Sequence, residues 1–149
     1  MLNSSKILIS ESALRNNIEF IRNLVSENVR VSIVVKSNAY GHGLRLFTET
    51  AYKFGVNHFS VFCFEEAKQI KKYLPDVDVM VMGWVSKRDI KKAVETGIEF
   101  YVFETERLKK AISEAIILGK RAKIHLEIET GMNRTGFNED DLFESIHTI

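Results

Sequence analysis

Five short apolar runs, rich in β-branched and aromatic residues, recur along this chain of 149 residues. They cover Val31–Val35, His58–Phe62, Val77–Met82, Ile98–Phe103 and Ile124–Ile128. The segments between them have the apolar spacing of amphipathic helices, and Gly97 and Gly119 stand where two of these helices would end. Because strands that alternate with helices form parallel sheets through right-handed crossovers, the sequence predicts an α/β protein.

The number of strands limits which α/β architecture this chain can complete. Periodicity alone does not distinguish an open doubly wound sheet from a (β/α)8 barrel, but such a barrel takes about 250 residues. Here about five βα units are visible, preceded by a predicted helix over Glu11–Ser26. A last segment, Leu142–Ile149, still has helical spacing where the sequence stops, and no linker rich in proline or serine interrupts the chain. We therefore expect residues 1–149 to be one piece of a larger fold.

Composition excludes several classes of function. The 21 basic and 20 acidic side chains leave a net charge of only +1, which predicts no nucleic acid or anionic membrane partner. No apolar stretch is long enough to span a bilayer. The single cysteine, Cys63, excludes an internal disulfide and has the neighbours of a core residue, which fits the reducing cytoplasm. No metal-ligand spacing is present, so His42 is expected to form hydrogen bonds within a turn.

Lys36 is the residue most suited to chemistry. It ends an apolar run and is followed by Ser37, Asn38, Ala39, Tyr40, Gly41, His42 and Gly43. A lysine at a strand end usually extends its amine into solvent. An amine at the mouth of a buried strand, before a glycine-containing turn, is also placed to bind an aldehyde cofactor covalently.

Two separated strings show a family resemblance that decides between these interpretations. Residues Val34–Gly43 resemble the pyridoxal phosphate signature of bacterial alanine racemases. Residues Thr130–Phe137, Thr-Gly-Met-Asn-Arg-Thr-Gly-Phe, resemble the other barrel signature of that family at a comparable distance downstream. The resemblance implies a partial (β/α)8 barrel over residues 1–149, which is the N-terminal part of such an enzyme, without its C-terminal β domain.

The resemblance also implies roles for individual residues. Lys36 resembles the lysine that binds pyridoxal 5'-phosphate and then acts as a base at the substrate Cα. Tyr40 resembles a tyrosine that hydrogen-bonds the cofactor phosphate. Arg134 resembles an arginine that reaches the cofactor's phenolic oxygen and the substrate carboxylate, for which a planar, permanently charged guanidinium is suited.

The run His125–Glu129 departs from the family pattern. Alternation places His125, Glu127 and Glu129 on one strand face. Many alanine racemases have a carbamylated lysine seven positions before the arginine, and this chain has Glu127 there. A glutamate offers a carboxylate without modification, so Glu127 is expected to support Arg134. Trp84, at another strand end, is expected to be a rim or core aromatic residue.

These observations predict the front part of a racemase that interconverts L- and D-alanine and supplies D-alanine for peptidoglycan. The intact enzyme is expected to be a cytoplasmic homodimer acting on a small amino acid, with its second base in the absent domain. Within the enzyme class, a serine or broad-specificity racemase remains an alternative, as do, less readily, a related decarboxylase and a barrel protein of cofactor homeostasis. From another class, the chain could be a non-catalytic fragment that binds pyridoxal phosphate. Alone, we expect it to be inactive and to self-associate through unpaired strand edges.

Overall fold

The computed structural model describes residues 6–147 and contains one sheet of five parallel strands in the order β1-β2-β3-β4-β5. The strands are β1 (Ile33–Val34), β2 (His58–Val61), β3 (Asp78–Val81), β4 (Glu99–Val102) and β5 (Ile124–Leu126). The helices are α1 (Glu11–Leu24), α2 (Lys36–Tyr40), α3 (Leu44–Lys53), α4 (Phe64–Tyr73), α5 (Lys87–Thr96), α6 (Thr105–Leu118) and α7 (Glu139–Ile146).

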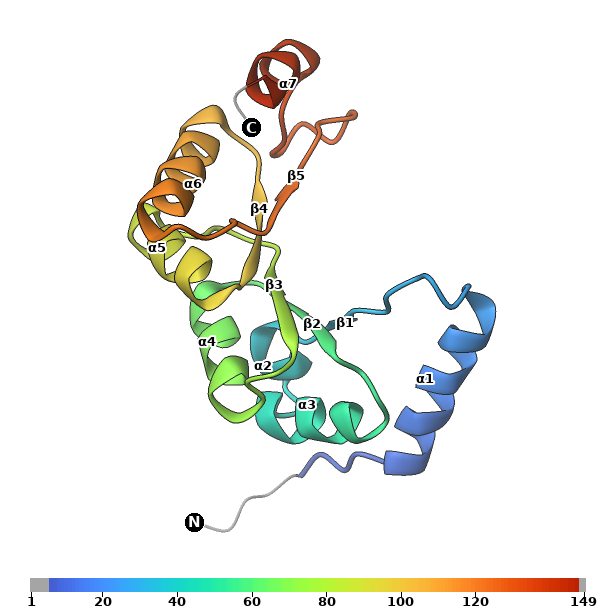
Figure 1. Cartoon of the computed structure of the whole chain (residues 1–149). Coiled ribbons are helices and arrows are strands. Elements are labelled where there is room, and N and C mark those ends of the chain that lie inside the picture. The colour runs from blue at the N-terminus through green and yellow to red at the C-terminus, as the bar shows by residue number, and fades with distance from the viewer. Residues whose placement is uncertain (1–5, 148–149) are drawn as a thin grey trace.

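The arrangement of the helices identifies the architecture as part of a barrel. Strands that follow one another in sequence are also neighbours in the sheet, and α3, α4, α5 and α6 all lie along its convex side (Figure 1). A doubly wound sheet would instead place helices on both faces and change direction in its strand order. The predicted α/β fold with five units of a (β/α)8 barrel is therefore confirmed.

The hydrophobic core lies between the strands and the outer helices. Alternate strand residues point into this layer and are fully buried, as are the helix residues that meet them. The strand members are Phe59, Val61, Val79, Val81, Phe100 and Val102, and the helix members include Ala67, Ile70, Ile90, Ala93, Leu108 and Ala111. The other strand face, which is concave, has a different composition, with polar side chains at Ser60, Asp78, Glu99 and His125.

The segment that follows Lys36 has a backbone that the sequence did not predict. Residues Ser37, Asn38, Ala39 and Tyr40 have φ angles of 53–55°, in the left-handed region. This region costs roughly 1–2 kcal/mol per residue for side chains with a Cβ, and such residues normally occur singly. Four in succession need support from the surrounding structure, and the strain lies directly beside the predicted cofactor lysine.

Other predictions need smaller corrections. All five strands are shorter than their apolar runs, and the first helix ends at Leu24 rather than Ser26. The final predicted helix is α7, although Ile149 lies outside the described residues. Cys63 is a free, half-buried residue directly before α4 and not a core residue, because the chain has already left β2. No helix within residues 6–147 has the length and apolar content needed to cross a membrane.

Candidate active site

A cavity of about 430 Å³ opens at the carboxyl ends of the strands. Apart from Tyr101, which lies within β4, its lining comes from the segments after the five strands: Lys36, Phe62, Met82, Gly83, Trp84, Tyr101, Phe103, Glu127, Arg134 and Thr135. Barrel enzymes place their chemistry at this end because the loops there converge. The cavity brings together Lys36, Glu127 and Arg134, three of the four site residues predicted from the sequence.

Lys36 owes its position to the end of β1. The preceding residue, Val35, is fully buried, and its N–H donates to the Ser60 carbonyl at 2.8 Å. The backbone direction is therefore set by β2 up to the point where the half-buried Lys36 begins. Its amine enters a cavity whose walls include the apolar side chains of Phe62 and Met82.

Glu66, which the sequence analysis did not single out, supports the left-handed turn. One carboxylate oxygen accepts from the Asn38 N–H at 3.2 Å and the other from the Phe62 N–H at 3.1 Å. The Asn38 side chain in turn accepts from the Leu44 N–H at 2.7 Å. Glu66 therefore links the segments after β1 and β2 at the edge of the cavity. Its position in the first turn of α4 gave no local signal of this, because acidic residues are common there.

Two residues of the same string have different outcomes. His42 Nδ1 lies 2.7 Å from the Ala39 carbonyl, which confirms the prediction that it serves as a hydrogen-bonding residue of the turn. Tyr40 is 59% exposed and is not among the residues that line the cavity. The structure therefore does not bring Tyr40 to the site with Lys36, and its predicted contact with a phosphate stays a prediction.

Glu127 and Arg134 share the cavity without pairing. The Glu127 carboxylate accepts a hydrogen bond from the Thr135 hydroxyl at 2.9 Å, and its backbone N–H donates to the Val102 carbonyl at 2.9 Å. Among residues 6–147 no ion pair joins Glu127 to the exposed Arg134. Thr135, which follows Arg134 in the sequence, thus holds the Glu127 carboxylate. The Arg134 guanidinium, which Glu127 is expected to support, takes no part in this hydrogen bond.

The predicted strand face through His125, Glu127 and Glu129 is not continuous. The strand ends at Leu126, so Glu127 and Glu129 both follow it, and Glu129 lies in the loop that leads to Arg134. Its carboxylate accepts from the N–H groups of Gly131 and Arg134, the latter at 3.2 Å. Hydrogen bonds from the backbone of Asn133 and Gly131 lower the pKa of the Glu129 carboxyl. Glu129 therefore shapes the loop that carries Arg134.

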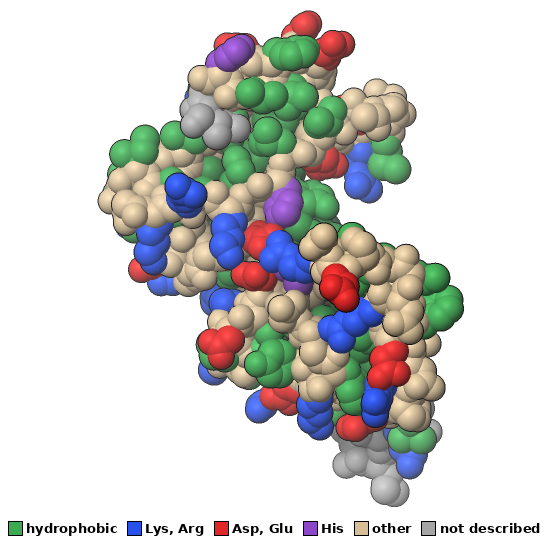
Figure 2. Space-filling view, turned by 45° about the vertical axis from the view of Figure 1, so that its right-hand side comes forward, with side chains coloured by type: hydrophobic (Ala, Val, Ile, Leu, Met, Phe, Trp, Pro, Cys, Tyr) green, Lys and Arg blue, Asp and Glu red, His purple; other side chains and the backbone are tan. Residues whose placement is uncertain are grey.

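A polar network occupies the concave face nearer the start of the strands, where Figure 2 shows acidic, basic and histidine side chains gathered together. Buried Glu99 is central: one oxygen lies 2.7 Å from His125 Nε2 and 3.4 Å from His58 Nε2, and the other lies 3.4 Å from Arg30. Burial opposes ionisation of Glu99, but the hydrogen bonds from His125 and His58 outweigh it, and the pKa of Glu99 is lowered. Burial also lowers the pKa of His58, against the effect of Glu99.

This network was missed at the sequence level, although a signal was present. His58 is the first residue of one apolar run and Glu99 the second residue of another, where a buried polar side chain needs a partner. The partner could not be identified, because the two residues lie 41 positions apart. In barrels this end of the strands serves stability more than chemistry. No group of three or more metal-ligating side chains suited to an ion occurs within residues 6–147.

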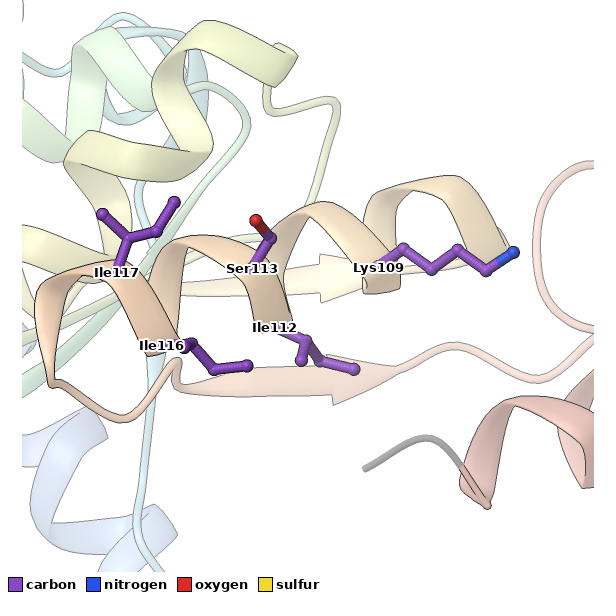
Figure 3. A pocket seen from close by; sticks show the side chains of 5 residues that line it. All are labelled: Lys109, Ile112, Ser113, Ile116 and Ile117. Carbon is purple, nitrogen blue, oxygen red and sulfur yellow. The ribbon is translucent and has the colours of Figure 1, made fainter.

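A second hollow lies on the outer surface of α6, far from the strand ends, and is lined by Lys109, Ile112, Ser113, Ile116 and Ile117 (Figure 3). The three isoleucines make it mostly apolar, and Lys109 extends away from the others along the helix. None of the four predicted site residues lines this hollow, whereas three of them line the cavity around Lys36, which is therefore the candidate active site.

Comparison with known proteins shows which family the chain is similar to. The family model described as "Alanine racemase, N-terminal domain" matches residues 9–149. Alanine racemase 2 of Caldanaerobacter subterraneus subsp. tengcongensis is 32% identical over 94% of this chain, and alanine racemase of Methanococcus maripaludis is 35% identical over 95%. The chain covers only 36% and 37% of these two proteins.

Solved structures give the same result. An alanine racemase of Clostridium difficile 630 superposes with a TM-score of 0.83 at 28% identity, covering 91% of this chain and 36% of that one. A histidine racemase of Leuconostoc mesenteroides subsp. sake superposes with a TM-score of 0.79 at 26% identity, covering 92% of this chain and 37% of that one. The fold therefore occurs in racemases named for different amino acids.

Proposed function

Since the chain belongs to the alanine racemase N-terminal domain family, we propose that it is the front part of a pyridoxal phosphate-dependent amino acid racemase acting on alanine. One observation carries the proposal: Lys36 and Arg134, almost 100 residues apart in sequence, line one cavity at the carboxyl ends of the strands. The whole enzyme is expected to be a cytoplasmic homodimer that supplies D-alanine for peptidoglycan.

The residues of the cavity fit the cofactor. Lys36 offers a half-buried amine for covalent attachment, and the cavity has both apolar and charged walls. When bound, pyridoxal phosphate supplies a conjugated system that accepts the electron pair left behind when a proton leaves the amino acid. Tyr40 is expected to bind the cofactor's phosphate, a role for which its turn would have to bring the hydroxyl toward the cavity.

Lys36 and Arg134 have different proposed roles in the reaction. Lys36 would hold the cofactor and, when its amine is free, would move a proton at the substrate Cα. Arg134 would pair with oxygen atoms of the cofactor and of the substrate carboxylate, and its fork of donors would orient them. Racemisation also needs an acid–base group on the opposite side of the substrate, which we expect from a residue outside this chain.

Glu127 is proposed to take the place of the carbamylated lysine of related enzymes. It lies in the same cavity as Arg134, and the Thr135 hydroxyl already orients its carboxylate. A bound cofactor that draws in Arg134 would bring the guanidinium nearer to this charge. If Glu127 has this role, activity does not depend on dissolved carbon dioxide, and Glu127→Gln weakens binding of the cofactor or the substrate.

A second candidate is racemisation of another amino acid. The similarity to a histidine racemase favours this candidate, because the two chains share a fold. Comparing kcat/KM of the full chain for alanine, serine and histidine decides between them.

Borohydride trapping tests the central proposal. The full chain that contains these residues is loaded with pyridoxal phosphate, reduced and digested, and the label is expected on Lys36. Lys36→Ala should lose the label and nearly all alanine racemisation, whereas Lys68→Ala, which removes an exposed helix lysine, should keep both. Labelling of a different lysine, or undiminished racemisation by Lys36→Ala, contradicts the proposed role.

A further inference from the structure

The side chain of Trp84 adjoins both the active-site cavity and a buried arginine. Trp84 follows β3, is 56% exposed and lines the cavity with Lys36. The guanidinium carbon of Arg107 lies 4.0 Å from the indole ring centre. The same carbon lies 4.8 Å from the ring centre of Phe103, which also lines the cavity. Arg107 therefore contacts two aromatic walls of the site without entering it.

Arg107 is unusual because it is buried without full pairing. Only 1% of the residue is exposed, on the first turn of α6. One terminal nitrogen donates to the Val85 carbonyl and the other lies 3.4 Å from a Glu104 carboxylate oxygen. Its Nε has no hydrogen-bond partner within the described residues. The two aromatic rings must therefore offset much of the free-energy cost of burying this cation, because cation–π attraction strengthens when water is excluded.

The backbone around Trp84 is fixed by its neighbours, so only the orientation of the Trp84 side chain can vary. The Gly83 N–H donates to the Phe62 carbonyl at 3.0 Å, and a Cβ on Gly83 would lie 2.4 Å from that oxygen. Val85, on the other side, is fully buried. The backbone at Trp84 is thus held on both sides, and its exposed indole needs further contacts to adopt one orientation. Phe103 packs obliquely against the indole with its ring centre 5.7 Å away, and Arg107 lies over the indole ring at 4.0 Å.

We propose that Trp84 forms a wall of the cofactor site that contacts the ring of bound pyridoxal phosphate, and that Arg107 is a positioning residue acting through Trp84. The inference deepens the proposed function and rests on it. A flat aromatic side chain offers a large contact area to a planar heteroaromatic ring with little loss of conformational freedom. Because the orientation of the indole depends on Arg107, loss of the guanidinium should weaken cofactor binding as loss of the indole does.

A double-mutant cycle on cofactor affinity tests this. The full chain is freed of cofactor and titrated with pyridoxal phosphate, followed by the absorbance of the bound form. Trp84→Ala should raise the Kd about tenfold, which corresponds to one aromatic contact, and Trp84→Phe should restore it to within about threefold. Arg107→Met should raise the Kd by five- to tenfold. The double variant should match Trp84→Ala alone, because Arg107 acts through the indole.

An arginine elsewhere provides the matched control. Arg45 lies over the ring of Tyr73 at 5.5 Å, away from the cavity, so Arg45→Met should leave the Kd unchanged. A Kd within twofold of wild type in Trp84→Ala overturns the contact, and multiplying effects in the double variant overturn the positioning role of Arg107. If Arg107→Met fails to fold, as circular dichroism would show, the exposed Trp84 variants still decide the contact.

Failure of this inference is distinguishable from failure of the proposed function. If wild-type protein carries the cofactor on Lys36 but Trp84→Ala binds it equally well, only the role of Trp84 is wrong. If the wild-type chain does not attach the cofactor at Lys36, the proposed function is wrong as well.

Discussion

Glu99→Gln is expected to destabilise the fold more than any change at the exposed ion pairs around it. The Glu99 residue is only 3% exposed, and its carboxylate meets both histidines and Arg30. Glutamine preserves size but removes the charge, and its amide offers one acceptor where two oxygens now accept. The Nδ1 of the buried His58 ring has no hydrogen-bond partner among residues 6–147, and the ring would lose part of its remaining interaction, which is with Glu99.

The expected loss of stability in Glu99→Gln depends on how exposed each partner of Glu99 is. A hydrogen bond to a charged group contributes about 1.5–3 kcal/mol, and leaving a buried polar group unsatisfied costs about 1–3 kcal/mol. Water can replace Glu99 at its exposed partners, because the side chains of His125 and Arg30 are 42% and 51% exposed. Only the interaction with His58 is fully buried, so we expect a total loss of about 2–3 kcal/mol.

Asp78→Asn is the matched control in the same network. Asp78 accepts from Lys123 at 2.9 Å and from Arg30 at 3.0 Å, but its side chain is 39% exposed. An exposed ion pair contributes about 0–1 kcal/mol. Urea unfolding at pH 7 and equal protein concentration should therefore lower the midpoint by about 1 M for Glu99→Gln and far less for Asp78→Asn. Equal shifts for the two variants would refute the argument from burial.

Three further expectations follow from the same contacts. Because the folded-state pKa of His58 lies below its ordinary 6.5 and that of Glu99 below its ordinary 4.5, the unfolded chain binds protons first. Urea midpoints should thus fall as pH drops from about 6.5 and fall further below about 4.5. Glu99→Gln should lack the part of the fall below about 4.5 that Glu99 contributes, whereas the fall from about 6.5 should persist, because Glu99 raises the pKa of His58. Gly136→Ala should lower the free energy of unfolding by about 2 kcal/mol or more, since the φ of Gly136 is 123° and a Cβ there would lie 2.6 Å from the Glu129 nitrogen. It should also weaken cofactor binding. Thermal unfolding measures the first effect and titration with pyridoxal phosphate the second. Glu66→Gln should raise the cofactor Kd severalfold by loosening the left-handed turn, and unchanged affinity would show that the turn holds without it.

Local patterns in the sequence determined the fold class and the central residues of the site. Apolar runs with intervening helical spacing predict parallel strands, because each run reflects which side of the sheet is buried. The strings after Lys36 and around Arg134 can likewise be recognised from neighbouring residues in the sequence alone. Since carboxyl ends of parallel strands meet at one edge, the sequence could predict that Lys36, Glu127 and Arg134 come together, which the cavity confirms.

The tertiary structure alone decided which distant side chains support that site. Glu66 contacts the turn after Lys36 across 28 positions. Glu99 on β4 meets His125 from the neighbouring β5 and His58 from β2, which lies beyond β3. Such pairs depend on strand register and side-chain exposure, which no local pattern encodes. The left-handed backbone from Ser37 to Tyr40 belongs here too, because its local energy is unfavourable and only surrounding contacts stabilise it.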